Sequence, residues 1–274
     1  MTVDFAVSII IVTHSSQSVL PRCLEAIDCQ SYAPSQIIVV DSGSDDTVYL
    51  DQLAERVRFT VLKCSNIGFA AANNRGLECI DPDCDYVLFI NPDTFLSKSA
   101  IEKALEIMEA QQRVAIVTGL LEGYDLSCSD RTGKIDSSGI FRTWYGRWYD
   151  RGKGRDIEKE LFRPEIVPAV CGALMFCRVS ALVDELPELF DPSFFMYKED
   201  IELCVRLSLH GWNVYFFPEI RAFHCRGWNQ KRKMIARSAR LMSARNEIKL
   251  YEKHPSVYIV WAWLKYVLVK LFNV

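Results

Sequence analysis

Residues 7–13 read VSIIIVT, a run dominated by apolar, β-branched residues. Such a run is typical of a strand that is buried on both faces, as in a parallel sheet covered by helices. Further along the chain, Leu20, Leu24 and Ile27 recur at helical spacing, and residues 37–40 (IIVV) form a second run of the first kind. The chain therefore begins with a strand, a helix and another buried strand, which is the order of an α/β sheet.

The same alternation continues through the first 110 residues. The pattern predicts, in order, a helix over residues 48–56, a strand over 59–62, a helix over 69–79, a strand over 86–90 and a helix over 100–110. Four strand–helix units in succession imply a mostly parallel sheet with helices on both of its faces. The predicted fold class is therefore α/β.

Beyond residue 110 the pattern is less regular. Residues 122–166 lack periodicity and are rich in Gly, Arg, Trp and Tyr, which indicates a long loop or a β-excursion. The ordered segments that follow are 167–176, a helix over 178–186, a helix over 199–209, a strand over 214–217, a helix over 230–253 and a last apolar segment over 257–272. We expect one large domain over residues 1–228 and a helical extension over residues 229–274.

The composition excludes several classes of protein. Half of the 274 residues are hydrophobic, which is ample for a packed core and excludes a disordered chain. The ten cysteines are about 4% of the 274 residues, well below the roughly 8–10% that marks a disulfide scaffold. None of them forms a CxxC pair, so no structural zinc site is expected. We expect reduced thiols in a cytoplasmic protein, because the start MTVDFAVSII lacks the features of a secretory signal.

Charge is unevenly distributed along the chain. The net charge of −3 argues against a nucleic-acid partner. Residues 231–253, however, carry eight Lys and Arg against two Glu, or +6, which leaves −9 for the rest of the chain. This asymmetry indicates a partner surface of negative charge near the C-terminal end.

The apolar segment over residues 257–272 is compatible with three roles. Its sixteen residues include two lysines and fall short of the ~20 apolar residues of a spanning helix. Trp261, Trp263 and Tyr266 are residue types that favour the bilayer interface, so the first role is peripheral contact with the inner face of the cell membrane. The second role is packing on the main domain, and the third is a homodimer contact.

Polar clusters follow three of the predicted strands, at residues 13–16, 41–47 and 91–93. Ligands of such sheets bind beyond the carboxyl ends of the strands, so we expect these clusters to converge. Asn91 and Asp93 offer the amide and carboxylate oxygens that suit Mg²⁺ or Mn²⁺, although Asn-Pro-Asp alone is also explained as a turn. The P-loop and GxGxxG motifs do not occur in the sequence, which removes the main support for those nucleotide-binding classes.

Seven segments together resemble the motifs of family-2 glycosyltransferases. In chain order they are SIIIVTHSS (8–16), VVDSGSDDT (39–47), NIGFAAANNRG (66–76), FINPDTFL (89–96), VCGALMFCRVSAL (170–182), FDPSFFMYKEDIELCVRLSLHGW (190–212) and AFHCRG (222–227). They stand in the family's order, and the later ones are similar to the rhamnosyltransferase-like branch. The resemblance implies a GT-A-type fold, a mostly parallel sheet flanked by helices that binds a nucleoside-diphosphate sugar, with the catalytic domain over residues 1–228.

The resemblance also implies roles for individual residues. The positions that match nucleotide and donor-sugar contacts are Thr13, Asp41, Asp46, Asn66, Gly68, Asn73, Asn74, Asn91, Gly172 and Ala173. Asn91 and Asp93 match the DxD-type motif, in which Asp93 corresponds to the ligand of Mg²⁺ or Mn²⁺. His224 matches a histidine that can complete the metal site. Asp200 matches the general base of inverting members, with Glu199 as the alternative.

These residue types suit the chemistry of glycosyl transfer. Negative charge builds on the departing diphosphate, and a divalent cation offsets it. The acceptor alcohol is a poor nucleophile, so a carboxylate must accept its proton, and a single displacement inverts the anomeric carbon. Taken alone, the acids at 199 and 200 are also explained as ordinary residues at a helix start, and His224 as a structural histidine.

We therefore expect a metal-dependent inverting glycosyltransferase that acts on a cell-surface glycan or its lipid-linked precursor. By resemblance the donor is dTDP-L-rhamnose, with a UDP-hexose or UDP-galactofuranose as the alternative. A nucleotidyltransferase that makes sugar nucleotides should show a Gly-rich signature near the N-terminus, and the sequence has none. The non-enzymatic alternative is a glycan-binding protein of the same fold, and the presence of Asp93, Asp200 and His224 argues against it.

Overall fold

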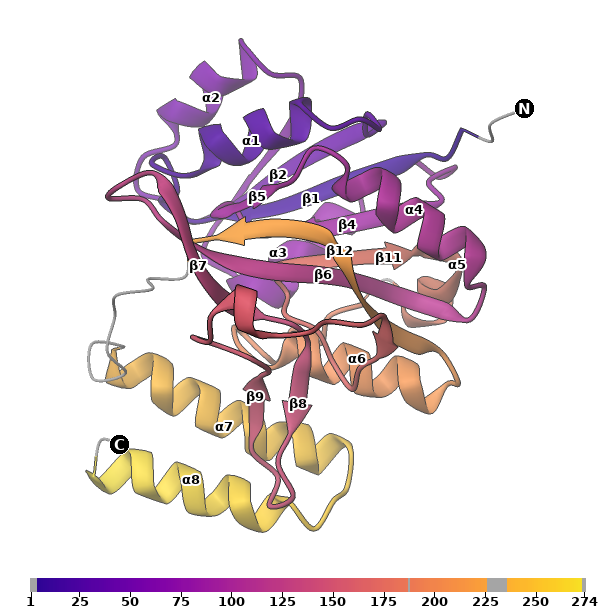
Figure 1. Cartoon of the computed structure of the whole chain (residues 1–274). Coiled ribbons are helices and arrows are strands. Elements are labelled where there is room, and N and C mark those ends of the chain that lie inside the picture. The colour runs from indigo at the N-terminus through magenta and orange to yellow at the C-terminus, as the bar shows by residue number, and fades with distance from the viewer. Residues whose placement is uncertain (1–3, 187, 226–235, 273–274) are drawn as a thin grey trace.

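The structure is a computed structural model that describes residues 4–186, 188–225 and 236–272 (Figure 1). In the first half of the chain the elements are β1 (Val7–Thr13), α1 (Leu20–Asp28), β2 (Gln36–Ser42), α2 (Val48–Ala54), β3 (Thr60–Cys64), α3 (Gly68–Leu77), β4 (Tyr86–Ile90), β5 (Thr94–Leu96), α4 (Ala100–Ala110) and β6 (Val114–Asp125). In the second half they are β7 (Asp130–Ser137), β8 (Ile140–Arg142), β9 (Trp148–Asp150), η1 (Ile157–Lys159), β10 (Glu165–Ile166), β11 (Leu174–Arg178), α5 (Val179–Leu182), η2 (Val183–Glu185), α6 (Glu199–Leu209), β12 (Asn213–His224), α7 (Arg237–Lys253) and α8 (Ile259–Phe272).

Within the described residues, ten strands form one mixed sheet in the order β10-β12-β6-β11-β4-β1-β2-β3, with β5 paired to β12 and β7 to β6. Strands β1 to β4 run parallel, as the sequence predicts, and the register places Thr13 opposite Asp41 at the carboxyl ends of β1 and β2. Strand β11 is antiparallel to both β4 and β6, while β6 and β12 are parallel. The two parallel groups therefore meet at one inverted strand.

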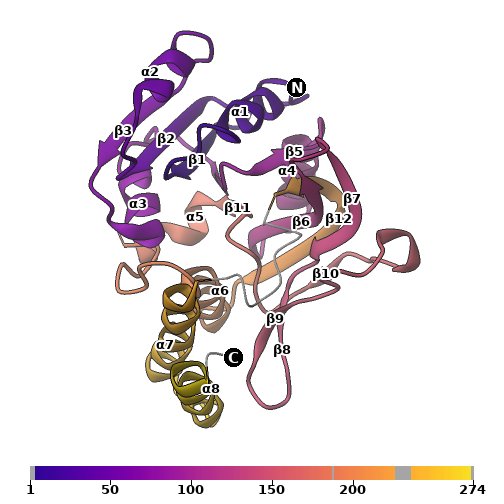
Figure 2. The same ribbon diagram turned by 90° about the vertical axis from the view of Figure 1, so that its left-hand side faces the viewer.

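Helices cover both faces of this sheet, as expected (Figure 2). Helices α1 and α4 lie together on one face, where the Gln30 side chain donates to the carbonyl of Ser97 (2.8 Å) and accepts from the amide of Ile101 (3.2 Å). Helices α3 and α6 lie on the other face. Every residue of β1 and β4 is buried, which explains their apolar sequences. The α/β class with a flanked, largely parallel sheet is confirmed.

In the second half of the chain, one of the two alternatives expected for residues 122–166 is confirmed, and one strand is longer than expected. Residues 122–166 form a β-excursion, with β7 on the sheet and β8 and β9 in a separate two-stranded hairpin. Strand β12 is longer than the expected 214–217. Its pairing with β6 is interrupted between Phe216 and Arg221 and then resumes as far as His224. This irregularity hides the second half of the strand from a periodicity analysis.

Helices α7 and α8 form an antiparallel pair beside the β8–β9 hairpin (Figure 1). The Tyr251 hydroxyl of α7 donates to the carbonyl of Gly146 in that hairpin at 2.6 Å. The start of the expected helix over 230–253, with Lys231, Arg232 and Lys233, lies outside the described residues, as does the domain boundary expected near residue 228. Among the helices that the structure describes, none is long and apolar enough to cross a bilayer.

Candidate active site

A cavity of about 390 Å³ opens beside the carboxyl end of β4, the start of α6 and the β8–β9 hairpin. Seven of the residues that the sequence singles out line it, namely Asn91, Asp93, Gly172, Ala173, Glu199, Asp200 and His224. They come from the β4–β5 turn, the loop before β11, the first turn of α6 and the end of β12. Segments that are far apart in the sequence therefore converge at one cavity.

Asp93 and His224, the two expected metal ligands, face each other in this cavity. The distance from Oδ1 of Asp93 to Nε2 of His224 is 3.3 Å. The antiparallel pairing of β5 with β12 places Thr94 opposite His224, and the amide of Cys225 donates to the carbonyl of Asp93 at 3.0 Å. Strand pairing thus brings the two side chains together.

A second carboxylate, Asp136 of β7, completes this cluster. Its Oδ2 lies 2.7 Å from Nδ1 of His224, and its Oδ1 lies 3.3 Å from Nζ of Lys153. The Asp136 side chain is fully buried. Sequence reasoning missed this residue, because it lies in the segment without periodicity, where the pattern does not indicate which side chains point inward.

The cluster has the charge and the donor atoms that suit a divalent cation. Burial alone would lower the pKa of His224, but its hydrogen bonds to Asp136 and Asp93 raise that pKa to about 9, so the two carboxylates favour a positive charge here. The buried Oδ1 of Asn91, in the same cavity, has no hydrogen-bond partner among the described residues.

The described part of the chain contains no group of three His, Cys, Asp or Glu placed to hold a metal by themselves. Mg²⁺ and Mn²⁺ are often held by one or two side chains together with substrate phosphates and water. Asp93 and His224 therefore fit a cation that a diphosphate helps to bind.

Asp200 and Glu199 stand at the first turn of α6, on a turn of unusual backbone geometry. Tyr197 and Lys198, immediately before them, have φ of 76° and 77°, a left-handed conformation that costs free energy in non-glycine residues. Oδ2 of Asp200 accepts a hydrogen bond of 2.9 Å from the amide of Gly172. This contact holds the Asp200 carboxylate at the cavity wall.

The two acids have different electrostatic environments. Burial and the charge of Asp200 raise the pKa of Glu199 well above its ordinary value, and Oε2 of Glu199 has no hydrogen-bond partner among the described residues. Burial also raises the pKa of Asp200, but the amide of Gly172 opposes this rise by stabilising the ionised form. Of the pair, Glu199 therefore holds the proton more readily, and Asp200 carries the charge.

The other residues expected to contact the nucleotide lie outside this cavity. Thr13 and Asp41 are buried neighbours at the ends of β1 and β2, where the Thr13 hydroxyl lies 3.1 Å from that of Tyr49. The Asp41 carboxylate accepts from the amide of Ser44 at 3.1 Å, and the Asp46 carboxylate, in the loop before α2, accepts from the amide of Val48 at 2.9 Å.

A second group of these residues has structural contacts. Asn66 accepts from the amide of Gly68 at 3.3 Å, and a Cβ on Gly68 would lie 2.4 Å from the carbonyl of Phe195. Asn73 donates to the carbonyl of Phe69 at 2.9 Å. Asn74 donates to the carbonyl of Phe190 at 2.6 Å and accepts from its amide at 2.9 Å. These contacts join the start of α3 to the loop that leads to α6.

The cavity has further lining residues that sequence reasoning did not place there. Trp148, Tyr149 and Asp150 of β9 form one wall, and Ser243 of α7 contributes to another. These side chains come from the irregular segment and from the C-terminal extension, and only the packing of α7 and the hairpin on the sheet brings them to the cavity.

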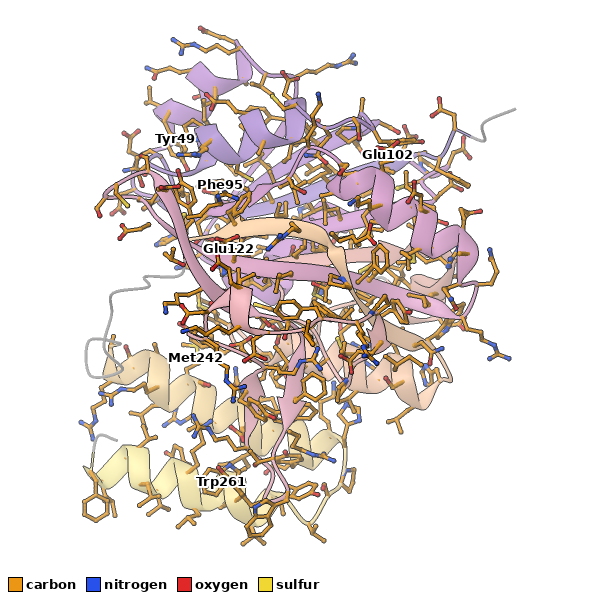
Figure 3. All side chains as sticks on the ribbon, in the orientation of Figure 1. Tyr49, Phe95, Glu102, Glu122, Met242 and Trp261 are labelled. Atoms are coloured by element: carbon orange, nitrogen blue, oxygen red, sulfur yellow. The ribbon has the colours of Figure 1, made fainter. Side chains whose placement is uncertain are left out.

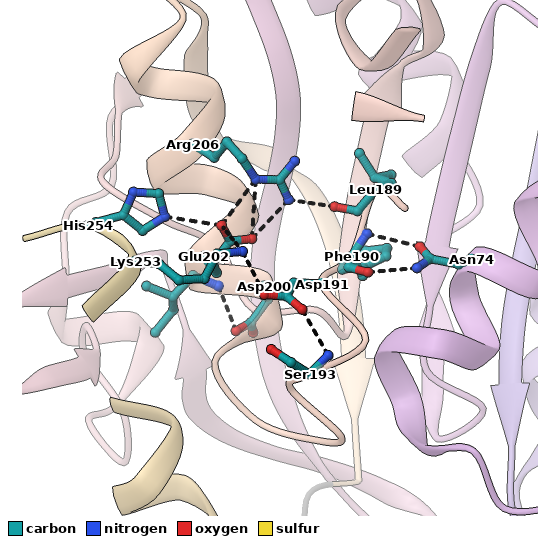
Figure 4. A network of polar contacts seen from close by, with 11 residues as sticks. Asn74, Leu189, Phe190, Asp191, Ser193, Asp200, Glu202, Arg206, Lys253 and His254 are labelled. Carbon is teal, nitrogen blue, oxygen red and sulfur yellow. Dashed lines mark hydrogen bonds and ion pairs between the residues drawn. The ribbon is translucent and has the colours of Figure 1, made fainter. Parts of the chain in front are cut away.

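A buried polar network joins α6 to the end of α7 (Figure 4). Its centre is Glu202, which is fully buried and accepts from Arg206 at 2.8 Å. His254 Nε2 lies 3.0 Å and Lys253 Nζ 3.4 Å from Oε1 of Glu202, and Lys253 also reaches Asp191 at 2.6 Å. The network fixes the helix that carries Asp200 against the C-terminal extension.

Solved structures with the same fold are glycosyltransferases. GalNAc-T7 with UDP, GalNAc and Mn²⁺ matches with a TM-score of 0.69 at 15% identity, over 90% of this chain and 48% of that chain. The mannosyltransferase PcManGT from Pyrobaculum calidifontis, in complex with GDP-Man and Mn²⁺, matches with a TM-score of 0.63 at 14% identity, over 99% of this chain and 72% of that chain. These likenesses show a fold of the GT-A type.

The sequence comparison identifies the family. The model of glycosyl transferase family 2 matches residues 8–184, so the chain belongs to that family and is a glycosyltransferase. The rhamnosyltransferase WbbL of Escherichia coli is 27% identical over 80% of this chain and 83% of its own length. An N-acetylglucosaminyl-diphospho-decaprenol L-rhamnosyltransferase of Mycobacterium tuberculosis is 23% identical over 79% of this chain and 75% of its own length.

Proposed function

We propose that this glycosyltransferase transfers L-rhamnose from dTDP-rhamnose, with inversion and with the help of Mg²⁺ or Mn²⁺, to a glycan or a lipid-linked saccharide. The observation that carries the proposal is the single cavity shared by the Asp93–His224 pair and the Glu199–Asp200 pair. The names of the two rhamnosyltransferase relatives support the choice of sugar. A UDP-hexose or UDP-galactofuranose is the alternative donor.

Asp93 and His224 would hold the cation, with Asn91 beside them. When bound, the cation offsets the charge that develops on the departing diphosphate. Asp136 positions the His224 ring by its contact with Nδ1, which leaves Nε2 facing Asp93. A carboxylate behind a metal-binding histidine commonly has this role.

Asp200 would act as the general base. It accepts the proton of the acceptor hydroxyl as the new glycosidic bond forms, because it is the more readily ionised member of the pair. The amide of Gly172 orients its carboxylate. Glu199, which holds its own proton more readily, would not compete for the proton of the acceptor hydroxyl.

The remaining predicted residues would bind the nucleotide at the ends of the parallel strands. Thr13 and Asp41 lie at the carboxyl ends of β1 and β2, and Asp46 and Asn66 follow β2 and β3, where ligands of parallel sheets bind. Gly68, Asn73 and Asn74 would shape this region through α3, and Gly172 and Ala173 would border the donor sugar. Residues 1–228 would form the catalytic domain, and the extension over 229–274 would complete the cavity wall through α7.

The test is a screen of sugar nucleotides with simple acceptors, measured by release of nucleoside diphosphate with Mg²⁺, with Mn²⁺ and with chelator. Preferential, metal-dependent turnover of dTDP-rhamnose would support the proposal. Preferential turnover of a UDP-sugar would select the alternative donor. Glycan binding without turnover of any donor would identify a non-catalytic glycan-binding protein instead.

A further inference from the structure

Helix α8 turns an apolar face outward. Val260, Trp263, Leu264, Val267 and Leu271 recur at spacings of three and four residues, so they share one side of the helix. All five are between 41% and 72% exposed, and Phe272 beside them is exposed as well. Contiguous exposed apolar surface of this kind marks a contact site.

The opposite side of α8 already has its packing partner. Ala262 and Val269 are buried, and the Lys265 ammonium forms an ion pair with the fully buried carboxylate of Glu247 in α7. The helix thus directs Lys265 inward and the five apolar side chains named above outward. Packing on the domain accounts for the inner side of α8 and leaves the outer side uncovered.

Aromatic residues border one edge of the outer side. Trp261 of α8 contacts Tyr145 with a ring-centroid distance of 4.7 Å, and Tyr145 contacts Trp144 at 5.4 Å. Trp144, in the turn between β8 and β9, is 87% exposed. Figure 3 shows Trp261 at the same end of the molecule as this turn.

Cations border the other edge. The Arg237 guanidinium donates to the carbonyl of Lys270 at 2.7 Å, and Arg245 reaches the hydroxyl of Tyr266 at 3.5 Å. The ammonium of Lys270 lies 5.7 Å from the centre of the Tyr266 ring. All three cations are exposed, and α8 itself contains no acidic residue. The outer side of α8 is therefore apolar in the middle and positively charged along one edge.

We propose that the outer side of α8, together with Trp144, binds peripherally to the surface of an anionic lipid bilayer. An apolar stripe bordered by cations and by Trp and Tyr is the composition of helices that lie in the bilayer interface. The fourteen residues of α8 span only about 21 Å, less than the hydrocarbon core, so the helix lies in the plane of the membrane.

The same charges disfavour a second copy of the chain as the occupant. A two-fold contact through this face would bring the basic edges of two molecules to one interface, and α8 has no acidic residue to pair with them. Ser243 and α7 connect this face to the cavity, so a bilayer under α8 lies on the side of the molecule where α7 borders the active site. Binding of α8 to a bilayer does not depend on which sugar the enzyme transfers.

The test is co-sedimentation of the full chain with vesicles of phosphatidylcholine alone and of phosphatidylcholine mixed with phosphatidylglycerol. We expect binding to the anionic vesicles at low ionic strength and a several-fold loss of binding at about 0.5 M salt. The double variant Leu264→Glu/Leu271→Glu should lower the partition coefficient at least ~10-fold. Its matched control is Leu161→Glu/Leu209→Glu, two exposed leucines away from α8, which should bind as the unchanged chain does.

A second pair of variants tests the charges. Arg245→Ala/Lys270→Ala should weaken binding to anionic vesicles, while Arg56→Ala/Arg58→Ala, at exposed sites near α2, should not. Sedimentation of the chain without vesicles shows whether it forms a dimer. If the full chain stays in the supernatant with anionic vesicles at low salt, or if Leu264→Glu/Leu271→Glu only converts a dimer to a monomer, the proposal is wrong.

Discussion

The carboxamide of Asn246 in α7 donates a hydrogen bond of 2.8 Å to the carbonyl of Tyr197. The same Nδ2 atom donates to the carbonyl of Met196 at 2.9 Å, and the Asn246 side chain is buried. Tyr197 begins the left-handed turn that presents Glu199 and Asp200 to the cavity. The C-terminal extension therefore stabilises the geometry of the candidate base from outside the family's sequence motifs.

Asn246→Ala should lower kcat by ~10–100-fold with a small change in the donor KM, because a slightly misplaced base slows the chemical step more than it weakens donor binding. It should also cost about 1–3 kcal/mol of stability, since two hydrogen bonds of about 0.5–1.5 kcal/mol each are lost. Steady-state kinetics and thermal denaturation measure the two effects. Gln30→Ala, which removes partly buried hydrogen bonds between the end of α1 and the start of α4, is the control and should lose stability without losing kcat.

Asp200→Asn should reduce turnover by ~10²–10⁴-fold while donor binding is retained, because the amide nearly preserves size and cannot accept the proton. Glu199→Gln should have a much smaller effect, since Glu199 holds its own proton more readily than Asp200 does. Turnover and calorimetric donor binding are the measurements. Near-normal turnover in Asp200→Asn with an inactive Glu199→Gln would transfer the role to Glu199.

Asp93→Ala should abolish metal-dependent donor binding and turnover without unfolding the protein. Asp136→Asn should weaken Mn²⁺ affinity by ~10–100-fold, because Asp136 orients His224 without facing the cation itself. Calorimetric titration with Mn²⁺ in the presence of nucleoside diphosphate measures both. Asp156→Asn, at a more exposed surface ion pair, is the control. Donor affinity that is the same with and without chelator would exclude the metal site.

The pH dependence of kcat/KM should show an acid limb above the range in which an ordinary aspartate titrates. Activity requires ionised Asp200, and burial raises the pKa of Asp200, so the rate should fall as the pH decreases through that raised value. The limb should persist in Glu199→Gln, because burial of Asp200 is unchanged there. A rate that stays constant down to about pH 4 would contradict the assignment.

Glu202→Gln should destabilise the protein by about 1.5–3 kcal/mol, because the mostly buried guanidinium of Arg206 loses its charged hydrogen-bond partner. Burial would raise the pKa of Glu202, but Arg206, His254 and Lys253 lower it. A lowered pKa in the folded state stabilises the protein above the unfolded pKa of Glu, and this stabilisation is lost as the pH falls through the lowered value. Thermal denaturation across this acidic range should show a smaller pH dependence in Glu202→Gln than in the unchanged chain. Asp51→Asn, in an exposed ion pair with Lys63, should change stability by less than ~1 kcal/mol.

Local sequence was sufficient for most of the fold. The apolar runs of β1 and β4 are buried along their whole length, and those strands, like α4 and α6, have the bounds that the periodicity predicts. A buried strand or an amphipathic helix records its environment in the spacing of its own residues, so no distant contact is needed to recognise it. The order of the seven motifs was likewise sufficient to predict the family.

Only the tertiary structure decided which residues meet. The contact of Asp136 with His224 depends on β7 and β12 flanking the same strand, and that of Asn246 with Tyr197 depends on α7 packing beside the turn before α6. Neither contact can be predicted from the spacing of residues along the chain, because each joins two segments that are far apart in the sequence. In each pair, one of the two side chains is an isolated polar residue. Which side of α8 faces outward could also not be predicted from its sequence, because the helix is apolar nearly all round. The buried partner of Lys265, Glu247, selects which side of the helix packs inward and so which side remains exposed.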